Sequence, residues 1–479
     1  MNILLFADGV VFLLLFMLIS KKKMKNRETG NKNVKVTVWA MSAALIFCLN
    51  SMVAQGAVFA SPSLAKGVVG VLGSKSAVSV GADQGSSETP TPAPIETYTG
   101  AAKGKNVIVI QLEAFQNILI GNSLNGTEIT PNLNALIKES LYYKNAISQI
   151  ASGNTSDAEF LLNTSLYPLK KEAPFKKYAN LDYKGLPYIM KTNGYYSATF
   201  HTNDSTFWNR KNMYPSLGFN RWYDKKDFEA REVVGYGASD GILYGKVLEK
   251  LKLMRTKKMP VYYNIITLSN HHPFRTPSWM KATSFGKEAD KTDAGRYVKT
   301  ANYTDRQLGI FFENLKKENL YDDALIVIYG DHFGISTKTD ADKKVIESFL
   351  GRPYDGLDTY NIPLIIKLPG SVRTGTIDMP AGQVDLMPTI LNLVGYENTD
   401  RKMYGQDLLN TTENEFGLRF YASDNTYVDN TGLYTGNGSY FSFDRQPGEA
   451  RSADPAKIKR IYDRINENDA YLKKLPKIK

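Results

Sequence analysis

The sequence predicts an α/β fold in which a mostly parallel sheet is flanked by helices. Short apolar runs typical of buried strands alternate with longer segments of helical period, from residue 106 to about residue 394. Strands separated by helices form βαβ units, which build parallel sheets with helices on both faces. Polar side chains suited to metal chemistry follow several of the runs, at the edge where open α/β sheets bind ligands.

The first predicted strand is Val107–Leu112, because this run is apolar and rich in β-branched residues. Thr130-Pro131 predicts the start of a helix over Asn132–Leu141, since Thr is a preferred cap and Pro a preferred first helical residue. A loop of small residues then precedes a helix expected at Ala158–Leu166. The later elements are expected at Leu186–Thr192 (helix), Ser197–His201 (strand), Ser239 or Asp240 to about Met254 (helix), Tyr262–Leu268 (strand), Asp293–Leu320 (helix), Leu325–Tyr329 (strand), Ile362–Lys367 (strand) and Asp385–Val394 (helix).

The pattern changes after about Leu409. Thr426–Phe443 is dense in Tyr, Asn and Gly, with an alternation that favours antiparallel strands. Asp454-Pro455 predicts the cap of a final helix that runs to about Lys474. We therefore expect a main domain at 105–409 and a small α+β subdomain at 410–479 that packs on it.

Two transmembrane helices are predicted within residues 1–60. Gly9–Ile19 and Val38–Ala60 are uncharged runs within segments of about the length that crosses a bilayer. A basic block begins at Lys21 between them and should stay cytoplasmic, which places the C-terminal bulk outside the cell. Residues 61–104, rich in Gly, Ser, Thr and Pro, are expected to be a flexible extracellular linker. The Val58-x-Ala60 ending has the form of a signal peptidase site, so release by cleavage after Ala60 is a further expectation.

Composition narrows the class of protein. Lys and Arg number 59 against 48 Asp and Glu, and this net charge of +11 suits an anionic membrane surface. The sequence has no zinc-finger spacing and no RNA-binding motif, so nucleic acid is the weaker partner. Cys48 is the single cysteine, which excludes an intramolecular disulfide and a cysteine-based metal cluster.

Candidate metal ligands end two of the predicted strands. Glu113 follows the first strand, and Asp331-His332 follows Leu325–Tyr329 and Gly330. All four histidines of the chain (His201, His271, His272 and His332) follow strand-like runs, and this favours one shared site. Oxygen ligands with one His suit Mn²⁺ or Mg²⁺.

Thr155 is the candidate nucleophile. It lies in the small-residue loop before a predicted helix, where backbone N–H groups favour an anion. Taken alone, Thr155 is better explained as a simple helix cap. Beside a metal ion, its hydroxyl becomes a plausible nucleophile, because the cation lowers the hydroxyl pKa.

A second set of residues suits a phosphorylated substrate. Arg210 can hold a phosphate through two hydrogen bonds, and Trp208 can form a pocket wall. Of the adjacent His271 and His272, one is expected to serve the site, because the two side chains point in different directions. The competing interpretation is a packed Trp208 with a solvated Arg210.

Seven motifs together resemble the lipoteichoic acid synthase family. In chain order they are Q-L-E-A-F at 111–115, T-P-N-L at 130–133, G-N-T-S-D-A-E-F at 153–160, F-H-T-N-D-S-T-F-W-N-R at 200–210, L-S-N-H-H-P-F at 268–274, Y-G-D-H-F-G-I-S at 329–336 and V-D-L-M-P-T-I-L at 384–391. The resemblance covers about Lys105 to Leu409. It implies the sulfatase and alkaline-phosphatase-like fold, with 105–409 as the catalytic domain. Members of this family usually have more membrane helices than the two predicted here.

The resemblance also implies roles for individual residues. The metal ligands would be Glu113, Thr155, Asp331 and His332, with Thr155 also the catalytic nucleophile and Mn²⁺ the cofactor. The substrate-binding residues would be His201, Asn203, Trp208, Arg210 and His271.

The function that the resemblance implies is phosphoglycerol transfer at the cell membrane. Thr155 would take glycerophosphate from phosphatidylglycerol through a phospho-threonine intermediate. The acceptor would be a polyglycerolphosphate chain, as in lipoteichoic acid synthesis, or a glycolipid anchor. Three alternatives stay open: a phosphodiesterase of the same fold, a phosphoethanolamine-type transferase, and a non-catalytic membrane-tethered binding protein. A sulfatase is disfavoured, because the sequence lacks the C/S-x-P-x-R motif that sulfatases need.

Overall fold

The computed structural model describes residues 98–335, 337–445 and 450–478. These residues belong to one compact unit of the chain, Pro90–Lys479. The predicted membrane helices within residues 1–60 and most of the predicted linker lie outside the described residues. Among the residues that are described, no helix combines the length and the apolar character needed to cross a bilayer.

Eight strands of the described chain form a mixed sheet in the order β13-β4-β12-β11-β1-β10-β6-β7. Their bounds, in that order, are Gly375–Ile377, Leu141–Tyr143, Leu364–Lys367, Leu325–Gly330, Val107–Leu112, Val261–Ile266, Tyr196–His201 and Arg221–Tyr223. β1 lies between two parallel neighbours, β10 and β11, and β6 pairs in parallel with β10. β12 runs antiparallel to both β11 and β4. The prediction of a mostly parallel sheet is therefore confirmed, with β12 as the antiparallel member.

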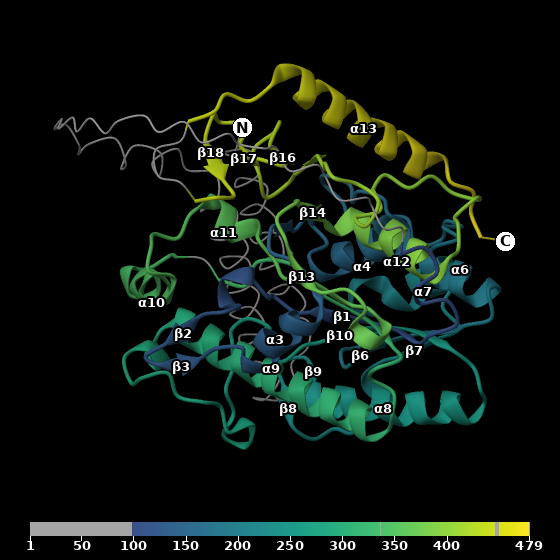
Figure 1. Ribbon diagram of the computed structural model, residues 1–479, viewed down its shortest axis with the longest axis horizontal. Helices are drawn as coiled ribbons and strands as arrows, with labels where there is room; N and C mark the ends of the chain where they lie inside the picture. The colour runs from purple at the N-terminus through teal and green to yellow at the C-terminus, as the bar shows by residue number, and fades with distance from the viewer. Residues whose placement is uncertain (1–97, 336, 446–449, 479) are drawn as a thin grey trace, which may run out of the picture. The chain divides into compact units, whose positions relative to one another are not determined.

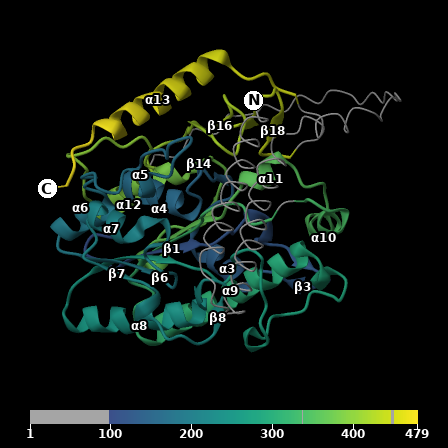
Figure 2. The same ribbon diagram turned by 180° about the vertical axis from the view of Figure 1, so that it is seen from behind.

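Helices cover both faces of this sheet (Figures 1 and 2). One face packs against α4 (Thr155–Thr164), α6 (Leu186–Thr192), α7 (Arg210–Leu217) and α12 (Leu386–Val394). The other packs against α3 (Pro131–Leu136), α8 (Asp240–Thr256) and α9 (Asp293–Lys317), and α10 (Asp340–Leu350) packs on α9. Val107 and Val109 of β1 belong to the first core, whereas Ile108 and Ile110 belong to the second. This alternation is the period of two expected of a strand buried on both faces.

Shorter elements complete the main part of the chain. Two short helices are α5 (Pro174–Lys177) and α11 (Gly356–Tyr360). Pairs of two-residue strands are β2 (Ser123–Leu124) with β3 (Thr127–Glu128), β5 (Ala146–Ile147) with β14 (Ala381–Gly382), and β8 (Val233–Val234) with β9 (Gly237–Ala238).

Several predicted helices have different bounds in the structure: the helix expected at Asp293–Leu320 ends at Lys317, and two others differ in ways that bear on the sheet and the site. The helix expected at Asn132–Leu141 ends at Leu136, passes into a 3₁₀ turn (Ile137–Glu139), and gives way to strand β4. The helix prediction was wrong at this end because buried Leu141–Tyr143 pair with β12 and β13, and tertiary pairing overrides local helical pattern. The helix expected at Ala158–Leu166 begins three residues earlier, at Thr155.

The C-terminal residues form a four-stranded antiparallel sheet and a long helix. The strands are β15 (Phe416–Gly417), β16 (Tyr427–Asp429), β17 (Gly432–Tyr434) and β18 (Tyr440–Ser442), and the helix is α13 (Pro455–Lys474). Ile461 and Ile465 of α13 belong to the same apolar core as Phe160 and Leu161 of α4. This segment therefore packs on the α4 side of the main sheet.

Asn468 joins α13 to the residues that follow α4. Its amide oxygen accepts from the backbone N–H of Tyr167, and its Nδ2 donates to the Tyr167 carbonyl, each over 3.0 Å. The Asn468 side chain is fully buried. It therefore satisfies both backbone groups of a residue that water does not reach.

Replacing Asn468 should destabilise the domain. In the Asn468→Ala variant both Tyr167 backbone groups lose their partner, and each unsatisfied buried group costs about 1–3 kcal/mol. We expect the free energy of unfolding in urea to fall by about 2 kcal/mol or more. Asn466→Ala, on the exposed side of the same helix, is the control and should change it by less than about 0.5 kcal/mol. Equal effects of the two variants would contradict the inferred role of Asn468.

Candidate active site

The candidate site begins where the central strands end. In the register of β1 and β11, Leu112 pairs with Gly330, so Glu113 and Asp331 leave the sheet at the same level. Position 330 must be glycine, because a Cβ there would lie 2.2 Å from the carbonyl oxygen of Phe115. On the other side of β1, Gln111 pairs with Ile266, which pairs in turn with His201 of β6. The parallel register thus brings residues from distant parts of the chain to one edge.

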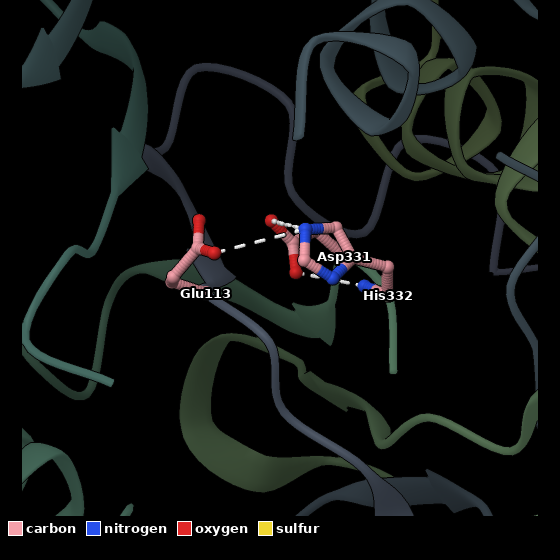
Figure 3. A group of neighbouring side chains, drawn as sticks. All are labelled: Glu113, Asp331 and His332. Carbon is pink, nitrogen blue, oxygen red and sulfur yellow. Dashed lines mark hydrogen bonds and ion pairs between the residues drawn. The ribbon is translucent and has the colours of Figure 1, made fainter. Parts of the chain in front are cut away.

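Glu113, Asp331 and His332 form a buried cluster (Figure 3). Each offers a ligand atom within 4.8 Å of the others. His332 Nε2 lies 3.7 Å from Glu113 Oε1 and 3.6 Å from Asp331 Oδ2. The exposed fractions of the Glu113 and Asp331 side chains are only 2% and 0%. Two ionised carboxylates in a site without water repel each other and lose their hydration, and a positive charge between them would offset this cost.

Electrostatics support the same conclusion. Burial and the neighbouring negative charge of Glu113 raise the pKa of Asp331 to about 8. Burial lowers the pKa of His332, but the charges of Asp331 and Glu113 more than offset this, and the net shift is upward. Both shifts favour the protonated forms of Asp331 and His332. A bound divalent cation would favour the ionised form of Asp331.

Thr155 lies against this cluster. Its Oγ1 is 3.2 Å from Glu113 Oε2 and 3.5 Å from His332 Nε2. It is the first residue of α4, and the preceding residue, Asn154, occupies the cap position. The interpretation of Thr155 as a simple helix cap was wrong, because its hydroxyl reaches Glu113 rather than the backbone of its own helix. The N-terminus of α4 adds N–H groups and a positive dipole end beside that hydroxyl.

A second layer of hydrogen bonds holds these side chains in place. Asp331 Oδ1 accepts from the backbone N–H of Ala114 over 2.7 Å. Gln111 Nε2 donates to the Thr155 carbonyl over 3.1 Å, and Tyr329 donates its hydroxyl to Gln111 Oε1. Asn270 Nδ2 donates to the carbonyls of Glu113 and Ala114. The metal-ligand candidates and the nucleophile candidate are thus parts of one rigid network.

Asp157 shapes the loop that leads into Thr155. Its Oδ2 accepts from the backbone N–H groups of Ala151 and Gly153 over 2.9 and 2.8 Å. A Cβ at Gly153 would lie 2.1 Å from Asp157 Oδ1, so the loop approaches this carboxylate too closely for any other residue. Burial raises the pKa of Asp157 to about 7.

The two predicted substrate histidines differ in environment. His201 is buried, and its Nδ1 lies 3.0 Å from the carbonyl oxygen of Ile266, so this nitrogen carries the hydrogen and Nε2 can accept. Burial and the nearby charge of Arg210 lower the pKa of His201 well below its usual value, which keeps the ring neutral. His271 is partly exposed, and its Nε2 lies 3.9 Å from Glu113 Oε1. His272 is exposed, so His271 is the member of the pair that faces the cluster.

The remaining predicted residues follow β6. Arg210 is buried and paired with Glu159, which excludes the alternative of a solvated arginine. Trp208 is half-buried, and Lys176 Nζ lies 4.3 Å from the centre of its ring. Asn203 is buried, and its Oδ1 accepts from the backbone N–H of Asp204. Asn203 is therefore occupied in shaping the turn after β6.

Four residues of the site were not predicted from the sequence: Gln111, Asp157, Glu159 and Asn270. Gln111 carried a usable signal, because it is a long polar side chain in an otherwise apolar strand, whereas Glu159 lies in a helix with several other polar residues and carried none. Asp157 and Asn270 carried none, since Asp and Asn are ordinary residues at helix starts and loops.

The donor set fits a hard divalent cation. Two buried carboxylates and one imidazole offer oxygen and nitrogen ligands, with the Thr155 hydroxyl beside them. Such a set suits Mn²⁺ or Mg²⁺.

The fold and the site together define a class of protein. Residues 105–396 match the family model described as Sulfatase. A protein of the alkaline phosphatase superfamily from Vibrio parahaemolyticus has a similar fold, with 20% identity and a TM-score of 0.63, over 80% of this chain and 91% of that one. The protein has the α/β fold of the sulfatase and alkaline phosphatase superfamily.

Nearer relatives identify the family. The crystal structure of the lipoteichoic acid synthase LtaP from Listeria monocytogenes is 32% identical, with a TM-score of 0.75, over 80% of this chain and 95% of that one. Lipoteichoic acid synthase 2 of Bacillus subtilis is 37% identical over 330 residues, 67% of this chain and 50% of that protein. The synthase of Staphylococcus saprophyticus is 37% identical over 332 residues, 67% and 50% of the two chains. The chain spans about half the length of these curated relatives, and it belongs to the lipoteichoic acid synthase family.

The carboxylate cluster predicts a measurable gain in stability on metal binding. Adding Mn²⁺ to chelator-treated protein should raise Tm by several degrees, because a ligand at 100 times its Kd stabilises the folded state by about 2.7 kcal/mol. In the Asp331→Asn variant, which removes one carboxylate, this metal-dependent rise should disappear. Asp323→Asn, at an exposed carboxylate, is the control and should retain it. A rise that survives in Asp331→Asn would place the metal elsewhere.

Proposed function

We propose that this protein is a membrane-anchored phosphoglycerol transferase whose catalytic domain lies outside the cell. It takes glycerophosphate from phosphatidylglycerol and passes it to a polyglycerolphosphate chain or a glycolipid anchor. The observation that carries the proposal is the position of Thr155. Its hydroxyl lies within hydrogen-bonding distance of Glu113 and beside His332 at a helix N-terminus. Membership of the lipoteichoic acid synthase family supports the choice of substrates.

In the first half-reaction, Thr155 Oγ1 attacks the phosphorus of the phosphodiester. A bond forms between Oγ1 and phosphorus, and the bond from phosphorus to the diacylglycerol oxygen breaks. The Thr155 hydroxyl proton is lost, and the departing diacylglycerol takes up a proton. The product is a glycerophospho-threonine. In the second half-reaction a hydroxyl of the acceptor attacks the same phosphorus and loses its proton. The bond from phosphorus to Thr155 Oγ1 breaks, and Oγ1 takes up a proton.

The residues around Thr155 divide these tasks. Mn²⁺ or Mg²⁺ held by Glu113, Asp331, His332 and Thr155 would supply positive charge for the Thr155 oxygen and the phosphoryl oxygens. Arg210 offsets the remaining phosphate charge in both half-reactions. His271, partly exposed and near Glu113, is placed to exchange protons with the departing and entering alcohols. His201, held neutral by burial, offers Nε2 as a hydrogen-bond acceptor for a glycerol hydroxyl.

The proposed location at the membrane is supported by the sequence. Residues 1–60 contain two apolar runs separated by a basic block, which predicts two membrane helices with the C-terminal part outside. The net charge of +11 suits work near anionic lipid. Release of the domain after Ala60 remains part of the same proposal.

The nucleophile can be tested by mass spectrometry of the intact protein. After incubation with phosphatidylglycerol vesicles and Mn²⁺, the wild type should gain the mass of one glycerophosphate, located at Thr155. Thr155→Ala should gain none, because it lacks the attacking oxygen. The control is Thr412→Ala, an exposed threonine remote from the cluster in sequence, which should gain the same mass as the wild type.

The same incubation separates transfer from hydrolysis. A phosphodiesterase would be favoured by two observations together. Diacylglycerol release would depend on Thr155, and free glycerophosphate would be the end product even when a polyglycerolphosphate acceptor is present. Neither adduct nor diacylglycerol release from metal-loaded wild type would contradict the proposed function.

A further inference from the structure

Arg210 is held by a carboxylate that the proposed chemistry does not use. Its Nε and Nη2 both donate to Glu159 Oε1, over 2.9 and 2.7 Å. Glu159 Oε2 accepts from the Tyr214 hydroxyl over 2.7 Å. The exposed fractions of the Arg210 and Glu159 side chains are 2% and 0%. Both oxygens of Glu159 are therefore occupied, and the guanidinium has little freedom to rotate.

One nitrogen of Arg210 is left over. Nη1 is buried and has no hydrogen-bond partner among the described residues. A buried guanidinium N–H without an acceptor costs free energy, so Nη1 is a candidate donor to a bound ligand. The charge of Arg210 interacts with predicted site residues. Burial and, after it, Arg210 lower the pKa of His201. For Arg210 itself, burial lowers the pKa, and Glu159, Tyr214 and, more weakly, Glu113 raise it.

The position of Glu159 in α4 links it to the nucleophile. Glu159 lies four residues after Thr155 in the same helix, so the two side chains lie on one face, one turn apart. Every residue of α4 is buried, and the helix packs against α6 and α12. Tyr214 and Arg210 are likewise four residues apart in α7. The distance between the nucleophile and the guanidinium is thus set by two rigid helices rather than by loops.

We propose that Glu159 is a positioning residue that directs Arg210 toward the phosphate of the substrate. Glu159 Oε1 accepts from Nε and Nη2, so Nη1 is the nitrogen left to donate to a phosphoryl oxygen. The Tyr214 hydroxyl donates to Glu159 Oε2 and so helps to fix the orientation of the Glu159 carboxylate. The expected effect on transfer rests on the proposed function. The expected effect on ligand affinity requires only that the site binds a phosphate ester.

Loss of the carboxylate charge should weaken both phosphate binding and transfer. In Glu159→Gln the amide can still accept one hydrogen bond, but it no longer anchors both Nε and Nη2 through a charged oxygen. We expect the rate of adduct formation at Thr155 to fall about 10- to 100-fold, since small misplacements of a charged group have effects of this size. The affinity for sn-glycerol 1-phosphate, measured by calorimetry with Mn²⁺ present, should fall at least about fivefold. Tyr214→Phe should show the same two effects with smaller size.

Two controls separate positioning from general loss of structure. Asp358→Asn removes a fully buried carboxylate paired with Arg352 and Arg445, and it should leave ligand affinity and adduct rate within about twofold of wild type. The second control is a double-mutant cycle. In an Arg210→Ala background, adding Glu159→Gln should change the adduct rate less than about twofold, because no cationic side chain is left for Glu159 to position.

The outcomes distinguish this inference from the proposed function. Wild-type affinity and adduct rate in Glu159→Gln would overturn the inference and leave the proposed function standing. An equal loss in the wild-type and Arg210→Ala backgrounds would also overturn it, because Glu159 would then act independently of Arg210. If the wild type binds the phosphate ester but forms no adduct, the proposed function fails and the affinities alone decide the role of Glu159. No binding by the wild type would overturn both.

Discussion

The site depends on two carboxylates that are buried side by side. Glu113 and Asp331 leave neighbouring parallel strands at the same level, and neither side chain is appreciably exposed. Burial, and after it the negative charge of Glu113, raises the pKa of Asp331, so the ionised pair requires a compensating charge. The Thr155 hydroxyl, at the N-terminus of α4, lies beside the same pair and beside His332. A divalent cation bound there would balance the charge of this cluster.

Backbone strain is concentrated around the same residues. Ala114, directly after Glu113, has a positive φ of 51°, and Asn154, directly before Thr155, has a φ of 44°. Trp208 and Asn209, just before Arg210, have φ values of 56° and 57°. Non-glycine residues adopt such conformations at a cost of about 1–3 kcal/mol each, and they persist where the surrounding structure holds them. Here the surrounding structure is a set of buried polar contacts, such as Asn270 on the Glu113 and Ala114 carbonyls.

Much of this arrangement could be predicted from the sequence, because strand exits are marked by a change from apolar to polar residues. Glu113, Asp331 and His332 follow buried runs, and parallel strands bring their carboxyl ends together without any knowledge of the register. The supporting residues could not be predicted in the same way. The partnership of Glu159 with Arg210 joins residues 51 positions apart on two helices, and only the packing of those helices determines it. Likewise, Leu141 was predicted to end a helix, but pairing in the sheet made it the first residue of β4.

The central claim is that one divalent cation at the edge of the sheet is held by Glu113, Asp331 and His332 with Thr155 beside it. Anomalous X-ray scattering from crystals of the domain grown with Mn²⁺ tests this directly. We predict one strong peak within coordination distance of Glu113, Asp331, His332 and the Thr155 hydroxyl. A fully occupied Mn²⁺ peak bound elsewhere, with none at these four residues, would contradict the claim.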